Sequence, residues 1–243
     1  QPAISNDGSS MIEIGIFCHE FGHVLGLGDL YDRDYSTQGI GEWGVMGFGN
    51  WNEPESPAHF CAYHKIKLGW ITPVEVKHDM TGVSIFNTEQ NPTVHKLWTN
   101  GNTNGKQYFL VENRQRIGFD KHLHGAGILI WHVDENRSDN DTDSHRLVDL
   151  EEADGLADLD VISRKNRGDD GDCYPGSTNN QRFDVNSSPN SKNYKFKDTK
   201  CGVINISASG ATMTADLLVG VSEMDVDLLV KDGPNDNGNE PSP

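Results

Sequence analysis

The residues best suited to chemistry lie near the start of the 243-residue chain, in the run HEFGHVLGLGD that begins at His19. His19 and His23 are four residues apart, so on a helix both imidazoles project from one face and can reach a single tetrahedral Zn²⁺. Glu20 lies beside them and is well placed to hold a metal-bound water. Gly26 can end the helix sharply and so bring Asp29 to the same ion as a third ligand, with the fourth position left to water.

A zinc ion held in this way would lower the pKa of its bound water to about 7. That water would attack a peptide carbonyl, with Glu20 as the general base that takes its proton and passes it to the leaving amine. The simpler alternative is that both histidines are structural residues of a buried helix. That alternative does not explain why Glu20, Gly26 and Asp29 stand at the spacings from the histidines that a zinc site needs. An iron oxygenase site would leave Glu20 without a role. The spacing therefore predicts metal-assisted hydrolysis of a peptide bond.

Two helices are expected around this motif. Residues 11–28 should form the first, with one apolar stripe on the side away from the two histidines. The stripe consists of Phe17, Phe21 and Val24. Gly26 and Gly28 break the helical pattern, as expected at a C-terminus. Pro57 can open a second helix, for which Gly69 is the stop signal.

The motif and its surroundings resemble the immune inhibitor A family of secreted bacterial metalloproteases, a metzincin-like group whose zinc motif ends in Asp. The resemblance covers roughly residues 12–219 and includes WGVMG at 43–47, where that group has its Met-turn. Further similar runs are LYD at 30–32, SPAH at 56–59, KIKLGW at 65–70, YFLVENRQ at 108–115, GILIWHVD at 127–134 and EADG at 152–155. The zinc motif is highly specific, and the later runs are more diffuse.

The resemblance implies a role for each motif residue: His19, His23 and Asp29 bind zinc, Glu20 is the base, and Met46 is the turn Met that packs beneath the metal. It also implies secretion by a bacterium and a protein or peptide substrate. Family catalytic domains carry a sheet-and-helix subdomain ahead of the active-site helix, whereas only eighteen residues precede His19 here. The missing N-terminal part of the same enzyme is therefore an expected partner.

The donor that would stabilise the oxyanion stays open from the sequence. Some metzincins have a Tyr two residues after the turn Met, but Phe48 stands at that position here and has no hydroxyl. The side chains that could take this role are Tyr31, Tyr63, His59 and His64.

The charge of the chain is strongly acidic, with 37 acidic against 20 basic residues and a net charge of −17. This balance argues against a nucleic-acid backbone or an anionic membrane surface as partner. The longest apolar runs fall far short of the roughly 18 residues that would suggest a membrane span. Most of the acidity is local, since residues 134–172 carry a net charge of −9 and residues 221–243 one of −5.

The acidic segment predicts at least one bound Ca²⁺, because oxygen-rich loops repel themselves unless they are solvated or neutralised. Part of it has acids at alternate positions, as calcium loops do. It is not an EF-hand, because Ser144 stands where an EF-hand has Gly and Leu150 where it has its bidentate Glu. A solvated acidic surface is the alternative. The candidate calcium ligands are Asp134, Asp139, Asp141, Asp143, Glu152 and Asp154.

The four cysteines are an even number and allow three pairings. No Cys-x-x-Cys spacing occurs, so a thiolate zinc site is not expected. In a secreted protein, Cys18–Cys61 and Cys173–Cys201 would join neighbours in the expected layout, whereas an intracellular protein would keep all four thiols free.

From about Ile71 the sequence changes to short β-like runs separated by Asn, Gly and Asp, which predict an antiparallel, sandwich-like domain. The runs are Val83–Phe86, Val94–Trp98, Tyr108–Glu112, Gly127–Val133, Val203–Ile206 and Thr212–Val219. We therefore expect an α+β protein. Residues 1–70 would be the helical, zinc-binding lower part of a metzincin-like catalytic domain, residues 71–220 the β-sandwich-like domain, and residues 221–243 an acidic tail or linker.

Two functions from different classes remain. The first is a secreted zinc-dependent endopeptidase with a metal-activated water and a glutamate base. The alternative is a catalytically silent fragment that serves as a calcium-stabilised structural or adhesive module.

Overall fold

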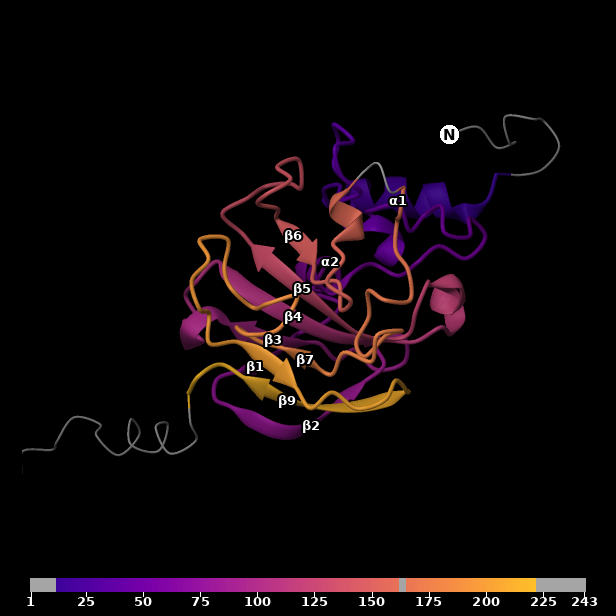
Figure 1. Cartoon of the computed structure of the whole chain (residues 1–243). Coiled ribbons are helices and arrows are strands. Elements are labelled where there is room, and N and C mark those ends of the chain that lie inside the picture. Colours follow the sequence, from indigo (N-terminus) through magenta and orange to yellow (C-terminus); the bar gives the residue numbers. More distant parts are fainter. Residues whose placement is uncertain (1–11, 162–164, 222–243) are drawn as a thin grey trace, which may run out of the picture.

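The structure, a computed structural model, describes residues 12–161 and 165–221. Within these ranges the protein is α+β, with two short α-helices and two β-sheets (Figure 1). The helices are α1 (Ile14–Val24) and α2 (Ala62–Lys67), and short 3-10 turns occupy Gly41–Trp43, Thr99–Gly101, Gly118–His122 and Asp158–Asp160. The expected tail lies outside the described residues except for Val221. No helix in the described ranges is long and apolar enough to cross a membrane.

The strands form a five-stranded and a four-stranded sheet. The larger sheet has the order β1 (Val74–Val76), β3 (His95–Trp98), β4 (Gln107–Arg114), β5 (Gly127–Asp134), β6 (Val148–Leu150). The smaller has the order β2 (Met80–Phe86), β9 (Thr212–Leu218), β8 (Gly202–Ile204), β7 (Arg182–Phe183). All neighbouring strands are antiparallel except β1 and β3, which run parallel.

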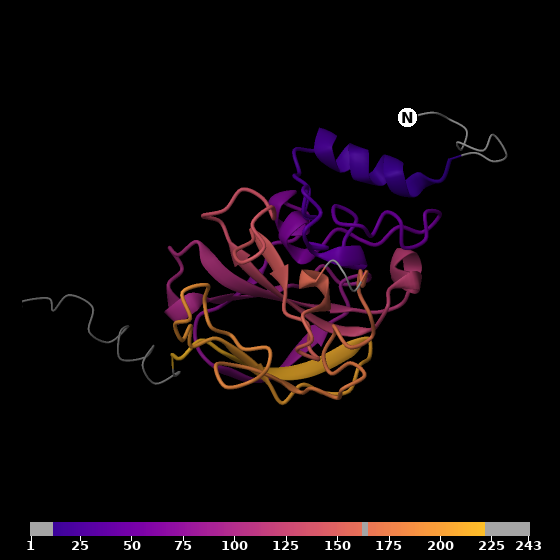
Figure 2. The ribbon, with the colours of Figure 1, turned by 45° about the horizontal axis from the view of Figure 1, so that its top comes forward.

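The larger sheet is buried on both faces, and successive residues of its central strands belong to different cores. Phe109 and Ile130 pack with residues of β8 and β9 between the two sheets. Leu110 and Trp131 face the opposite side, where they join a core with the segment that follows α1, including Trp43. Figure 2 shows the resulting layers, with α1 and its following loops on one side of the larger sheet and the smaller sheet on the other. Residues on both sides of position 70 thus share one core, and the expected domain boundary there stays a prediction.

The strand predictions agree with the structure in their positions. Each of the six expected runs overlaps an observed strand, and the α+β class is confirmed. The sequence did not reveal β1, β6 and β7, which have only two or three residues each.

The expected disulfides are wrong: all four cysteines, which lie in the described ranges, are free thiols. The members of each expected pair pack in different hydrophobic clusters. Cys18 packs against the cluster of Leu27 and Val45, whereas Cys61 belongs to the core of Trp43. Cys173 and Cys201 are likewise divided between the two cores on either side of the larger sheet. Burial raises the pKa of Cys61, Cys173 and Cys201 to about 12, which keeps these thiols protonated.

Candidate metal centre

Helix α1 is shorter than expected and packs through its small residues. Its buried positions are Gly15, His19 and Gly22, whereas Phe17, Phe21 and Val24 of the apolar stripe are 42%, 59% and 77% exposed. A Cβ atom added at Gly15 would lie 2.2 Å from the carbonyl oxygen of Asn50. The helix therefore lies on the loop below it by close backbone approach, and His19 is the one large side chain that is carried into that contact.

The end of α1 brings the third predicted ligand back to the helix. The backbone N–H groups of Leu25 and Gly26 donate to Phe21 and His23, and Gly26 has a φ of +88°, in the region that favours glycine. The N–H of Leu27 then donates to the carbonyl of Gly22. This turn directs the chain towards Asp29, as the spacing of the motif predicts.

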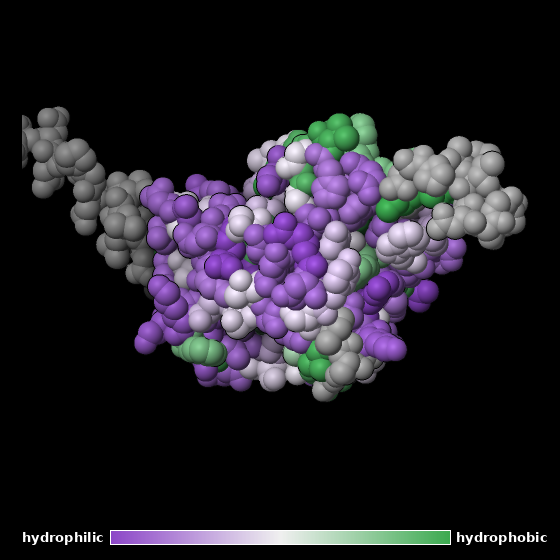
Figure 3. Space-filling view, turned by 90° about the horizontal axis from the view of Figure 1, so that it is seen from above, coloured by the Kyte–Doolittle hydropathy of each residue, from purple (hydrophilic) through white to green (hydrophobic). Residues whose placement is uncertain are grey.

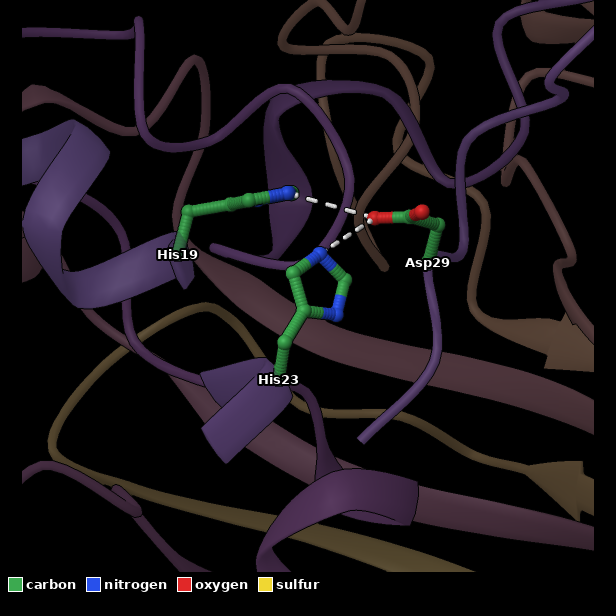
Figure 4. Close-up of side chains that lie close together, drawn as sticks. All are labelled: His19, His23 and Asp29. Carbon is green, nitrogen blue, oxygen red and sulfur yellow. Dashed lines mark ion pairs between the residues drawn. The ribbon is translucent and has the colours of Figure 1, made fainter. Parts of the chain in front are cut away.

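The side chains of His19, His23 and Asp29, which we call the histidine cluster, converge on one point (Figure 4). The Nε2 atoms of both imidazoles lie 3.2 Å from Oδ1 of Asp29, and the potential ligand atoms all lie within 4.8 Å of one another. Oδ1 of Asp29 is buried and has no hydrogen bond of acceptable geometry. Two nitrogens and one carboxylate oxygen at such separations are a donor set that suits Zn²⁺.

Backbone carbonyls fix which nitrogen of each imidazole faces the cluster. Nδ1 of His19 lies 2.8 Å from the carbonyl oxygen of Val45, and Nδ1 of His23 lies 3.0 Å from that of Leu27. A carbonyl oxygen only accepts, so each neutral imidazole carries its proton on Nδ1 and presents the lone pair of Nε2 to the cluster. This is the tautomer that a metal ligand needs.

The cluster is electrostatically balanced. Burial alone would lower the pKa of His19, but the Asp29 carboxylate and the Val45 carbonyl raise it above its ordinary value. Burial alone would raise the pKa of Asp29, but the two histidines lower it below its ordinary value. The carboxylate therefore stays ionised beside the imidazoles.

Glu20 and Met46 lie on opposite sides of the contact between α1 and the loop below it. Glu20 is exposed on α1, next to His19 in the chain and outside the cluster itself. Met46 is 1% exposed and lies beneath the helix, because a Cβ atom added at Gly22 would come within 2.4 Å of its sulfur. The N–H of Leu30 donates to the carbonyl oxygen of Met46 at 2.8 Å, which joins the turn to the chain just after Asp29.

The four oxyanion candidates are in different surroundings. His64 is 1% exposed, and burial lowers its pKa to about 3. Tyr63 is 8% exposed in the core, and His59 lines an apolar cavity of about 350 Å³ together with Cys18. Tyr31 is the candidate whose ring stacks on a predicted ligand, 6.1 Å from the ring of His19 between centroids.

Two of the six calcium candidates are brought together, and they are joined by an acid that the sequence did not single out. Glu152, Asp154 and Asp172, which we call the acidic cluster, have potential ligand oxygens within 4.8 Å of one another. Glu152 and Asp172 are 5% and 1% exposed. Burial and nearby acids raise the pKa of Glu152 to about 9, and burial raises that of Asp172 to about 7. The signal for Asp172 was its place in the acid-rich run DDGD at 169–172.

The other four candidates have protein partners instead. Asp134 lies 2.8 Å from Nε2 of His145. Asp139 and Asp141 pair with Arg33, and Asp143 accepts a hydrogen bond from the Ser36 hydroxyl at 2.7 Å. Arg33 thus neutralises part of the charge of this loop, and Ser36 supplies a hydrogen bond; both residues follow the histidine cluster in sequence.

Comparisons with known proteins agree with the site. Residues 7–71 match the family model described as immune inhibitor A peptidase M6, catalytic domain. Immune inhibitor A of Bacillus thuringiensis subsp. alesti is 50% identical over 77 residues, which cover 27% of this chain and 11% of that protein. The chain thus matches only a small part of the relative's length.

The ligand arrangement and the family match together indicate a metallopeptidase-like site. The two comparisons support a relationship of this part of the chain to the immune inhibitor A family.

Proposed function

We propose that this protein is a secreted, zinc-dependent endopeptidase. The observation that carries the proposal is the convergence of two Nε2 lone pairs and a buried, unbonded carboxylate oxygen on one point, 3.2 Å apart. A zinc ion bound by His19, His23 and Asp29 would supply an activated water and polarise the scissile carbonyl. The match of residues 7–71 to a peptidase family supports the peptidase activity, and the resemblance to secreted bacterial metalloproteases is the basis for proposing secretion.

The protein's own residues would share the remaining work. The exposed carboxylate of Glu20 would take the proton of the attacking water and donate it to the leaving amine. The Val45 and Leu27 carbonyls would hold the two imidazoles in the ligand tautomer. Met46 would support the helix from below, in the manner of the Met-turn of metzincins.

We propose further that the apolar face of α1 is covered by the N-terminal part of the same enzyme. This face holds five large apolar side chains between 40% and 77% exposed: Ile14, Phe17, Phe21, Val24 and Leu25. Figure 3 shows green apolar side chains gathered near the upper edge of the molecule in the view from above. Exposed apolar patches of this kind mark interaction surfaces.

A calcium ion bound by the acidic cluster is the third part of the proposal. Three carboxylates in close proximity, two of them buried, favour a hard cation with oxygen ligands. The same cluster supports the alternative function, a catalytically silent module stabilised by calcium.

The deciding experiment compares the parent chain with Glu20→Ala, using casein cleavage and bound zinc as readouts. We expect about one zinc per chain in both proteins, and loss of cleavage in the variant by about 10²–10⁴-fold, the usual contribution of a general base. Glu13→Ala removes another exposed carboxylate next to the start of α1 and should cleave like the parent.

If Glu20→Ala cleaves casein as fast as the parent, the assigned mechanism is wrong. A parent chain that binds zinc but does not cleave would favour the silent module.

A further inference from the structure

Tyr31 lies between the histidine cluster and a stack of planar side chains. Its ring is nearly parallel to that of His19, with an interplanar angle of 22° and a centroid distance of 6.1 Å. Two further rings stack with it: Phe48, at 5.4 Å and 29°, and the exposed Tyr35, at 6.2 Å and 12°. Burial raises the pKa of Tyr31 to about 12, and the charge of the Asp29 carboxylate and hydrogen bonding of the Tyr31 hydroxyl to it add to this rise. One side chain therefore touches two of the three predicted zinc ligands.

The far end of the stack is anchored in another part of the chain. The guanidinium of Arg167 lies over the Phe48 ring at 4.0 Å from its centroid, close enough for a cation–π contact. The backbone of Arg167 is fixed as well, because its carbonyl accepts the N–H of Glu42 at 2.6 Å. The order of contacts is Arg167, Phe48, Tyr31 and His19. The segment after the larger sheet thus reaches the histidine cluster through three planar side chains.

We propose that Tyr31 is a positioning residue of the metal centre: its ring holds the His19 imidazole in plane, and its hydroxyl orients the Asp29 carboxylate. His19 would then be fixed twice, by the Val45 carbonyl at Nδ1 and by Tyr31 across its ring face. This inference rests on the proposed zinc site. Partners of this kind typically change metal affinity by about 10–100-fold when they are removed.

The hydroxyl distinguishes positioning from simple packing. If Tyr31 only filled space against His19, a phenylalanine would serve equally well, as Phe48 does at the next place in the stack. A phenol that contacts a carboxylate instead keeps one carboxylate oxygen engaged and leaves the other to face the imidazoles.

The test is Tyr31→Phe, with Tyr63→Phe as the matched control that removes a phenolic hydroxyl from a buried ring of the core. Zinc affinity is measured by competition with a chelator, and the geometry of the site is followed by the visible spectrum of the Co²⁺-loaded protein. We expect Tyr31→Phe to bind zinc about 10-fold more weakly and to shift the Co²⁺ bands. Tyr63→Phe should match the parent in both. The unfolding temperature of metal-free Tyr31→Phe should equal that of the parent, because the ring is kept.

Each result has a defined meaning. Unchanged zinc affinity and unchanged Co²⁺ bands in Tyr31→Phe would overturn this inference, even if casein cleavage fell, since Tyr31 would then act on substrate. A parent chain that binds no zinc would overturn the proposed function itself. If Tyr31→Phe is destabilised, Arg167→Ala decides: it disturbs the stack without touching a ligand, and the inference requires it to weaken zinc binding more than Tyr63→Phe does.

Discussion

The histidine cluster and the acidic cluster each bring three potential ligands within 4.8 Å, but their electrostatics are opposite. In the histidine cluster, the imidazoles lower the pKa of Asp29, so its carboxylate is stabilised in the ionised form even without a metal ion. In the acidic cluster, burial raises the pKa of Glu152 and Asp172 to about 9 and about 7. The imidazoles of the first cluster stabilise its ionised carboxylate. The carboxylates of the second cluster repel one another when ionised, unless they bind protons or a cation.

The two clusters also differ in their potential ligand atoms. Nitrogen and carboxylate donors in the first cluster suit zinc, and an all-oxygen set in the second suits calcium. The surroundings differ as well, since backbone carbonyls and a ring stack support the histidines. Backbone N–H groups of Asp158 and Leu159 donate to Glu152, and the Trp43 indole donates to Asp172.

The largest effect is expected from removing a ligand of the histidine cluster. Loss of a residue that supports a ligand typically weakens metal binding by about 10–100-fold. His23→Ala removes a ligand itself and should weaken zinc binding by more than this. A ligand stabilises the folded state appreciably only when its concentration exceeds its Kd, so zinc at a concentration below the Kd of this variant should no longer raise its unfolding temperature. His122→Ala, on a 3-10 turn away from the cluster, serves as the control. Equal zinc-dependent stabilisation in His23→Ala and the control would break the comparison.

The second prediction concerns the pH dependence of the acidic cluster. With raised pKa values, folded Glu152 and Asp172 hold protons that the unfolded chain has already lost above about pH 4–5. The contribution of these groups to the free energy of unfolding should therefore fall as pH rises from about 5 to about 9. Calcium needs the ionised carboxylates, so its stabilising effect should grow over the same range.

The measurement is thermal unfolding at pH 5, 7 and 9, with and without CaCl₂. Asp154→Asn should reduce the calcium effect at pH 9, whereas Asp141→Asn, whose partner is Arg33, should not. A calcium shift that is the same at pH 5 and pH 9 would show that the ion binds elsewhere.

Two matched glycine substitutions, one beside each cluster, should have moderate effects on stability and on metal binding. In Gly22→Ala, the new Cβ would lie 2.4 Å from the sulfur of Met46, and in Gly171→Ala it would lie 2.4 Å from Oδ2 of Asp154. Overpacking of this kind costs about 1–3 kcal/mol, or roughly 2–4 °C per kcal/mol in unfolding temperature for a chain of this size. Gly22→Ala should also weaken zinc binding, and Gly171→Ala should weaken only calcium binding. Weaker calcium binding in Gly22→Ala, or weaker zinc binding in Gly171→Ala, would mean that the two clusters are coupled.

The smallest effect is expected at the loop that resembles a calcium loop in sequence. Arg33 is exposed and pairs with Asp139 and Asp141, and exposed ion pairs contribute little to stability. Arg33→Ala should leave the unfolding temperature nearly unchanged without calcium. A new calcium-dependent stabilisation in this variant would show that Arg33 occupies the place of a cation.

The sequence predicted the parts of the fold and site that depend on local spacing. Six of the observed strands overlap predicted runs, and the four-residue spacing of His19 and His23, with Gly26 after them, correctly indicated which side chains converge. The expected disulfides failed because cysteine spacing does not show which core each thiol enters. The apolar stripe of α1 indicated a helix, but not that glycines, rather than Phe17 and Phe21, would face the loop below.

By itself the sequence determined which potential ligands converge, because helical periodicity and a glycine turn fix relative positions over about ten residues. Only the tertiary structure decided what surrounds these side chains. It brought the Val45 carbonyl to His19 across 26 residues, Arg167 to Phe48, and Asp172 to Glu152. Contacts of this range depend on how whole sheets and loops pack together, and no local pattern of residue types encodes them.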